Sequence, residues 1–165
     1  MNTKVSAQPG AAVNVRAVAA TTGAALAGLL LLAAITATTG LELFALPFAA
    51  SAAIVAVAPQ APFAQPRSIL VGQLSATALA LVITAVMGPS VWAAAVAAGL
   101  SIAPMMLARA PHPPAAATAA LIGLTDPDPL FILNPVLPAS VVVIAGGVVL
   151  GKVMRGAHRY PASWR

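Results

Sequence analysis

The sequence predicts an integral membrane protein built of α-helices, and three observations support this prediction. Hydrophobic residues make up 61% of the 165 residues and charged residues only 7%, whereas about 25% of an average soluble domain is charged. The charged residues are separated by uncharged runs, most of which can hold a bilayer-spanning helix of about 20 residues. The chain is also rich in alanine and contains 12 glycines, small residues that let membrane helices pack closely.

Four apolar segments are long enough to be full transmembrane helices. They cover residues 17–39, 69–87, 91–109 and 134–152. Two further apolar segments are shorter and begin with proline, which suits the first turn of a helix because its missing N–H has no partner there. Pro47 and Pro114 are therefore predicted helix starts. These two helices, of about 10–12 residues, are expected to be re-entrant or broken.

The two short segments match each other at a constant offset of 67 residues. Pro47 aligns with Pro114 and Ser51 with Thr118. The alanines around them also match, but alanine-rich runs match one another by chance more easily than proline and hydroxyl positions do. The coincidence of proline and hydroxyl positions predicts a tandem two-fold repeat. Paired, proline-interrupted short helices indicate a binding site in transporter folds. The predicted halves are residues 17–87 and 91–151.

The charge distribution leaves two topologies open. With re-entrant short helices the chain crosses four times, and Arg67 and Arg109 lie on the side of the three acids. With crossing short helices it crosses six times, all basic residues share one side, and the halves are inverted. The excess of Lys and Arg on cytosolic sides favours six crossings, whereas helix length favours four. In both, the N-terminal tail 1–16 and the basic tail 152–165 flank the membrane domain 17–151 and lie in the cytosol, predicted for a bacterial inner membrane protein.

Polar residues inside apolar segments are the main candidates for function, because placing them in a bilayer is expensive. His112 precedes Pro113 and Pro114 at the start of a short helix, and a helix N-terminus attracts anions through its unpaired N–H groups and dipole. His112 adds a hydrogen bond or a proton, and Arg109 adds a fixed positive charge. The plainer interpretation makes Arg109 an interfacial anchor and His112 a cap of the preceding helix.

The hydroxyls of Ser51 and Thr118 are predicted to approach a substrate from two sides. Alternatively, each bonds to its own helix backbone. Arg67 is either a pathway charge or an anchor. We take these residues, with the His-Pro-Pro stretch and Arg109, as the predicted substrate-binding set.

Several classes of function are disfavoured. The two histidines, His112 and His158, lack the spacing of metal ligands, and cysteine is absent. No cofactor is implied, and the sequence contains no nucleotide-binding loop or nucleophile elbow, so an enzyme is not expected. The net charge of +5 comes from scattered residues rather than a basic face with aromatics, so nucleic acid is not an expected partner.

The sequence resembles the HPP family of integral membrane proteins, named for the His-Pro-Pro motif that stands here at His112-Pro113-Pro114. The resemblance rests on the segments 61–67, 105–119 and 134–136 and extends over about 41–160. It implies four transmembrane helices, and some members in cyanobacteria and chloroplasts are implicated in nitrite transport. Family members often carry glycines after the motif, whereas Ala115 and Ala116 stand here, which would narrow a close approach by a ligand.

The leading hypothesis is a transporter or channel for a small anion, with nitrite suggested by the resemblance. The anion would be held at the N-termini of the short helices near His112. The alternatives are a membrane scaffold or accessory subunit, and a transporter of protons or a neutral solute. The expected partners are the lipid bilayer, a small inorganic anion and further copies of the chain, since 165 residues are few for a complete pathway.

Overall fold

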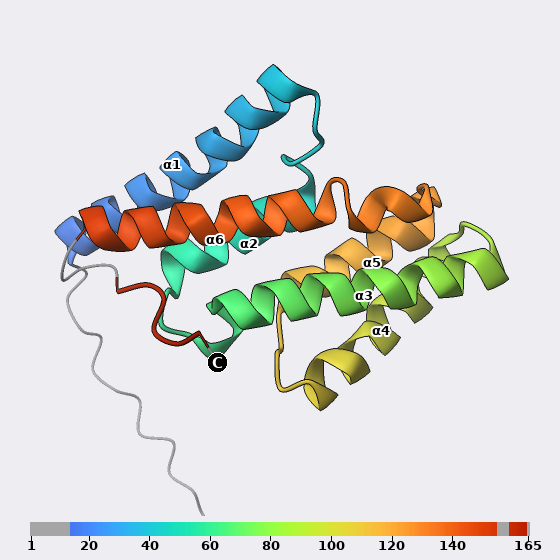
Figure 1. The fold of residues 1–165 in the computed structure, drawn as a ribbon. Helices are drawn as coiled ribbons and strands as arrows, with labels where there is room; N and C mark the ends of the chain where they lie inside the picture. Colours follow the sequence, from blue (N-terminus) through green and yellow to red (C-terminus); the bar gives the residue numbers. More distant parts are fainter. Residues whose placement is uncertain (1–13, 155–158, 165) are drawn as a thin grey trace, which may run out of the picture.

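The computed structural model describes residues 14–154 and 159–164, and within them the regular structure is entirely helical. Most of the predicted N-terminal tail and part of the basic C-terminal tail, including His158, therefore lie outside the described residues. The helices, shown in Figure 1, are α1 (Val15–Thr39), α2 (Leu46–Val57), α3 (Pro66–Met87), α4 (Val91–Leu107), α5 (Pro113–Thr125) and α6 (Val136–Val153), with 3-10 turns η1 (Pro62–Ala64) and η2 (Pro129–Ile132).

The short helices begin where their prolines predict. Pro47 lies in the first turn of α2, and α5 starts at Pro113 with His112 in the N-cap position. The N-cap of α2 is Ala45, so the two helices start at the offset that the sequence match predicts. Proline fixes the backbone in a helix-compatible conformation and has no N–H that would need a partner there.

The helix α4 ends two residues earlier than predicted. Arg109 adopts a left-handed backbone conformation with φ of 51°, and the N–H of Ala110 donates to the carbonyl of Met105 at 2.9 Å. This is the hydrogen bond that closes a helix C-terminus around a left-handed residue. With 17 residues, α4 is shorter than the three segments whose length and composition suit a full membrane span. Those segments are α1, α3 and Pro129–Val153.

The six helices form two bundles of three. One bundle consists of α3, α4 and α5, and the other of α1, α2 and α6. Each has its own hydrophobic core: alanines, Met105 and Ile122 fill the first, whereas the second contains larger side chains such as Leu32, Phe48 and Tyr160. The bundles meet where α3 contacts α6 and where α2 contacts α5.

The helix contacts remain the same when the predicted halves of the chain are exchanged. As α1 packs on α2, so α4 packs on α5. As α3 packs on α4 and α5, so α6 packs on α1 and α2. Each bundle thus contains two helices from one half and the third helix of the other half.

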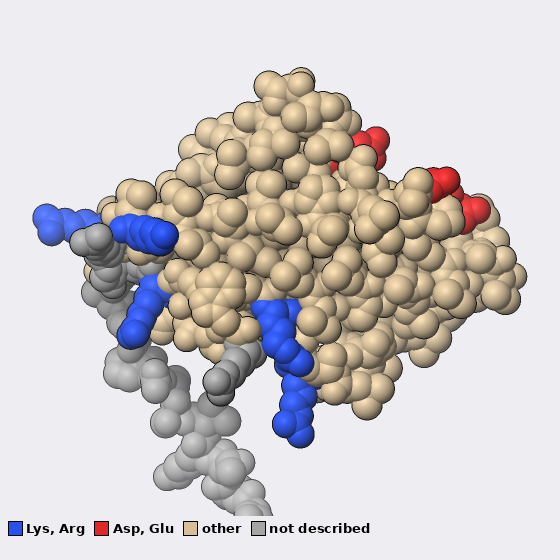
Figure 2. All heavy atoms as spheres, in the orientation of Figure 1, with Lys and Arg blue, Asp and Glu red and all other residues tan. Residues whose placement is uncertain are grey.

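Successive helices run in opposite directions, so the chain passes six times between the two ends of the molecule (Figure 1). Arginine and lysine side chains of the described residues gather along one end, and the acidic side chains along the opposite end (Figure 2). This is the charge separation expected from six passes rather than from two re-entrant helices. The short passes are α2 and α5, and segments outside the α-helices at 40–45, 58–65 and 108–112 complete them.

Candidate functional site

Four buried polar side chains lie together where the two bundles meet. Ser51 of α2 is 1% exposed, and Gln73 of α3, His112 and Thr118 of α5 are 0% exposed. We call these four residues the polar cluster. Three of them belong to the predicted substrate-binding set. The structure brings them together from segments up to 67 residues apart in the sequence.

Both ring nitrogens of His112 are engaged. Nδ1 lies 2.8 Å from the backbone oxygen of Phe63, in the turn η1. Nε2 lies 2.9 Å from Oγ of Ser51. Because a carbonyl oxygen can only accept, Nδ1 carries a hydrogen, and Nε2 is the nitrogen left to gain or lose a proton.

Gln73 joins the two short helices. Its amide nitrogen donates to Oγ of Ser51 at 3.3 Å, and its amide oxygen accepts from the hydroxyl of Thr118 at 2.6 Å. Ser51 also lies within reach of its own helix, with Oγ 2.9 Å from the oxygen of Pro47. The cluster is therefore a continuous chain of hydrogen bonds from α5 through α3 to α2 and back to His112.

A glycine on α3 makes room for the histidine. A Cβ added at Gly72 would lie 2.7 Å from Cβ of His112, closer than side-chain carbons approach in proteins. The residue that precedes Gln73 thus allows the loop carrying His112 to pack directly on the helix. This close approach places both Gln73 and His112 against Ser51.

The N-termini of α2 and α5 offer few backbone donors to an anion. Pro47, Pro113 and Pro114 have no N–H, and the N–H groups of Phe48 and Ala115 already donate to carbonyls in their own first turns. An anion held here would depend mainly on side-chain donors and on the positive ends of the helix dipoles. Pro114 is buried, whereas Pro113 is exposed.

One more donor lies near the cluster on α3. Thr77 is four residues beyond Gln73, and residues at this spacing share one face of a helix. Its side chain is 0% exposed, and its hydroxyl oxygen has no hydrogen-bond partner. A buried hydroxyl without a partner costs about 1–3 kcal/mol of stability. A polar ligand that bonded to the Thr77 hydroxyl would remove this cost, so Thr77 is the most favourable position for one beside the cluster.

The two predicted arginines lie together at the basic end, outside the polar cluster. The guanidinium of Arg67 donates to the backbone oxygens of Ala108 at 2.7 Å and Arg109 at 3.0 Å. The side chain of Arg109 is exposed, because its left-handed backbone turns the chain before His112. Arg67 therefore holds the loop that carries the histidine, and Arg109 carries a charge at the surface.

Gln65, the residue two positions before Arg67, joins the turn before α3 to the C-terminal segment of the chain. Its amide nitrogen donates to the oxygens of Pro59 and Ala61, and its amide oxygen accepts from the N–H groups of Ala162 and Ser163. The Gln-Pro-Arg stretch thus fixes both the turn before α3 and the loop before α5. Its polar groups position the site without entering it.

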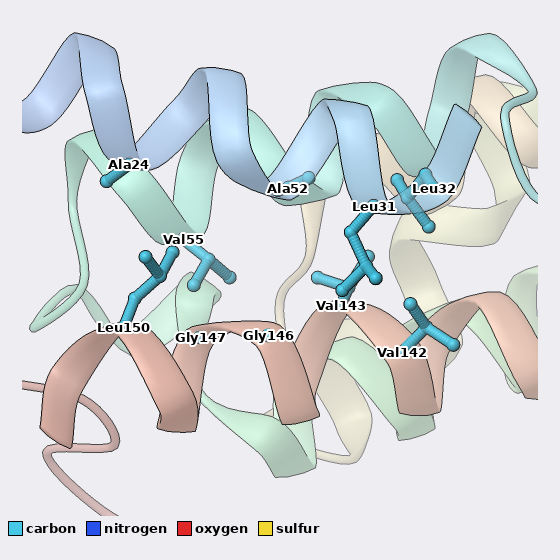
Figure 3. A pocket seen from close by; sticks show the side chains of 11 residues that line it. Ala24, Leu31, Leu32, Ala52, Val55, Val142, Val143, Gly146, Gly147 and Leu150 are labelled. Carbon is cyan, nitrogen blue, oxygen red and sulfur yellow. The ribbon is translucent and has the colours of Figure 1, made fainter. Parts of the chain in front are cut away.

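The small cavity in Figure 3 is a poor candidate for the site. It lies between α1, α2 and α6, has a volume of about 20 Å³, and is lined by apolar side chains and glycines such as Leu32, Val55 and Gly147. This is room for one water-sized group at most. No side chain that lines it can donate a hydrogen bond.

Two groups of the site were missed in the sequence. Gln73 carried a usable signal, because it is the only Asn or Gln inside any of the six α-helices, and an amide at membrane depth is expensive. The oxygen of Phe63 carried none, since every residue has a carbonyl and only the fold selects this one.

The fold and the cluster together define a helical membrane protein with a buried polar centre between two short, oppositely directed helices. Residues 10–161 match the family described as the HPP transmembrane region. The chain therefore belongs to the HPP family. The resemblance seen in its motifs is confirmed over nearly its full length.

Two transmembrane proteins of Dictyostelium discoideum are similar to this chain. They are 30% and 31% identical over 125 residues, which is 71% of this chain. The chain spans less than half of their length, 40% and 44% respectively. No solved structure matches the chain.

Proposed function

We propose that this protein transports a small anion across the membrane and that the polar cluster is the point through which the anion passes. The observation that carries the proposal is the meeting of two short helices, by their N-terminal halves, around buried Ser51, Gln73, His112 and Thr118. Short helices that meet inside a membrane domain form the substrate sites of many transporters, and their N-terminal ends favour negative charge.

One side chain of the cluster and one beside it are suited to bind an anion. Gln73 has two amide hydrogens, of which one is bonded to Ser51. The hydroxyl of Thr77 is unpartnered one turn away. These two donors lie on the same face of α3, and the arginines at the basic end would attract an anion towards it. The family resemblance suggests nitrite as the substrate.

We also propose that the two halves are inverted repeats that cross the membrane six times. The contact pattern that survives exchange of the halves and the separation of basic from acidic ends support this arrangement. The basic end would face the cytosol of a bacterial cell, following the excess of Lys and Arg on cytosolic sides. Rocking of one bundle against the other would open the cluster to each side in turn.

Uptake into proteoliposomes tests the function. Wild type should take up nitrite, nitrate, formate or chloride faster than protein-free vesicles, which correct for nitrous acid that crosses lipid unaided. His112→Ala should remove this uptake and Arg109→Ala should lower it. Ser140→Ala is the matched control, because Ser140 is equally buried but bonds only to its own helix, at Val136. Failure of all four anions to move would overturn the proposal.

One observation favours a second candidate, the non-transporting scaffold or accessory subunit. All four members of the cluster are bonded to one another or to backbone, as in a site whose purpose is to hold helices together. The same experiments separate the two candidates. A scaffold would show no uptake, and His112→Ala would lower only its thermal stability.

A further inference from the structure

The hydroxyl of Ser51 has one hydrogen and two acceptors for it. The oxygen of Pro47 and Nε2 of His112 each lie 2.9 Å from Oγ. The amide of Gln73 donates to the same Oγ, so it cannot take the hydrogen. Which acceptor receives the hydrogen is therefore decided by whether Nε2 of His112 is protonated.

Both protonation states of His112 are fully hydrogen-bonded with the heavy atoms where they stand. In the neutral ring, Nδ1–H donates to Phe63, and Ser51 donates its hydrogen to Nε2. In the charged ring, Nε2–H donates to Oγ of Ser51, which turns its own hydrogen to the oxygen of Pro47. Oγ then accepts from His112 and Gln73 through its two lone pairs. Proton uptake thus leaves no ring nitrogen without a partner.

We propose that His112 binds the proton that moves together with the anion, and that the Ser51 hydroxyl turns between His112 and Pro47 as the proton comes and goes. The inference rests on the proposed transport of an anion and names its coupling ion. Each cycle would carry one proton on Nε2 and one monovalent anion beside it, with no net charge moved.

The surroundings of His112 require that the two ions bind together. The helices α2 and α5 and the turn η1 carry no ionisable side chain, and α3 carries only Arg67. Arg109, three residues upstream, is exposed and also positive. A buried imidazolium here would have positive helix ends and arginines as neighbours, and a buried charge without a counter-charge is strongly disfavoured. An anion at Gln73 and Thr77 supplies that counter-charge.

The same bonds link proton binding to the contact between the bundles. Ser51 is the only member of the polar cluster from the α1–α2–α6 bundle, whereas Gln73 and Thr118 belong to helices of the other bundle and His112 caps one of them. Separation of the bundles therefore breaks the bonds of Ser51 to His112 and Gln73. A change in the charge of His112 acts directly on this contact.

Nitrogen NMR of isotopically labelled histidine tests the proton site without transport. In the full chain carrying His158→Gln, His112 is the only histidine. At alkaline pH its hydrogen should be on Nδ1, the minor form of free histidine. Nitrite or nitrate at mildly acidic pH should convert the signal to the charged ring. Ser51→Ala should lower the pH of this conversion, while Ser140→Ala should not. A hydrogen on Nε2 at alkaline pH, or a ring that stays neutral with either anion, would overturn the inference.

Flux measurements separate this inference from the proposed function. With an imposed anion gradient, a pH dye inside the vesicles should report acidification that matches anion uptake, independent of an applied membrane potential. Ser51→Ala should lower the coupled flux at least about tenfold, equivalent to about 1.4 kcal/mol, and Ser51→Thr should retain part of it. Anion uptake that follows the potential without acidification would refute proton coupling and leave anion transport standing. If wild type showed no anion uptake but kept the NMR response, transport would be refuted, and the joint binding of proton and anion at His112 would stand.

Discussion

The two bundles have the same layout but differ in how closely their helices pack. In the α3–α4–α5 bundle, a Cβ added at Gly123 would lie 2.4 Å from Cα of Ala94, so the backbones of α4 and α5 are in direct contact. At the corresponding contact of α1 with α2, a Cβ added at Gly28 would lie 3.8 Å from Cβ of Ala52. The apolar span that contains α6, Pro129–Val153, is 33% buried, against 44% for that of its counterpart α3.

This difference indicates that the two bundles have different roles in the protein. The closely packed bundle supplies His112, Gln73 and Thr118, and its helices α4 and α5 are in backbone contact at Gly123. The other bundle supplies Ser51, and its α1 packs less closely on α2, although α6 approaches α2 closely at Gly147, where an added Cβ would lie 2.6 Å from a side-chain carbon of Val55. A transporter built on this plan would keep its site on the rigid bundle and move the other bundle against it.

Gly123→Ala should have the largest effect on stability. Its methyl group would meet backbone atoms of Ala94 and Ala93, and overpacking of this kind costs about 3 kcal/mol. Thermal unfolding in detergent should show a large fall in Tm. Gly99→Ala on the same bundle is the control, because nothing lies within 4 Å of its added Cβ. Equal Tm values for the two variants would contradict the close contact of α4 with α5.

Gln73→Leu should have the second largest effect, lowering the free energy of unfolding by about 2 kcal/mol. It removes the acceptor of the Thr118 hydroxyl and a donor to Ser51, both buried. Ser75→Ala on the same helix should leave Tm nearly unchanged, because Ser75 bonds only to the oxygen of Gly72. A Gln73→Leu protein as stable as wild type would show that the cluster does not join the bundles.

Thr118→Val should lower the free energy of unfolding by about 1 kcal/mol more than Thr84→Val does. Both threonines are buried and near the carbonyl four residues back, but only Thr118 also donates to Gln73. The comparison by thermal unfolding isolates the bond between α5 and α3. In the Gln73→Leu background the difference between the two valine variants should disappear.

Gly28→Ala should leave the protein as stable as wild type or raise its stability by up to about 1 kcal/mol, since alanine has the higher helix propensity. Its methyl would make an ordinary contact with Ala52. The measurement is again Tm in detergent. A fall as large as that of Gly123→Ala would show that both bundles are equally rigid.

Thr77→Val should leave the protein at least as stable as wild type, and raise its stability by up to about 1 kcal/mol, because a buried hydroxyl without a partner is replaced by a methyl group. Anion uptake should nevertheless fall, since this hydroxyl is the proposed second donor to the anion. Normal uptake in Thr77→Val, with normal Tm, would remove Thr77 from the proposed path.

Helix starts and the composition of the site were largely predictable from single residues. Pro47 and Pro114 lie in the first turns of α2 and α5, because the effect of proline on a helix is local. Ser51, His112 and Thr118 were recognisable as polar residues in apolar surroundings, whose burial requires partners. The predicted repeat placed the two short helices as counterparts, whereas Gln73, which joins Thr118 to Ser51, was not predicted.

Long-range geometry was not predictable in the same way. The left-handed turn at Arg109 directs its side chain to the surface. Arginine does not favour the left-handed conformation, so the sequence does not predict a turn at this position. The pairing of the Arg67 guanidinium with two backbone oxygens depends on where two loops meet. Spacing along the chain contains no information on such a meeting.

The exchange of the third helix between the bundles has a consequence for the order of synthesis. The α3–α4–α5 bundle is contiguous in the chain and can close as soon as α5 emerges from the ribosome. The pair α1 and α2 inserts first, yet waits for α6, the last helix made. Until α5 is made Ser51 also lacks His112 as a partner, so the newly inserted pair is the stage of biogenesis at which an insertase or chaperone would have the most exposed surface to hold.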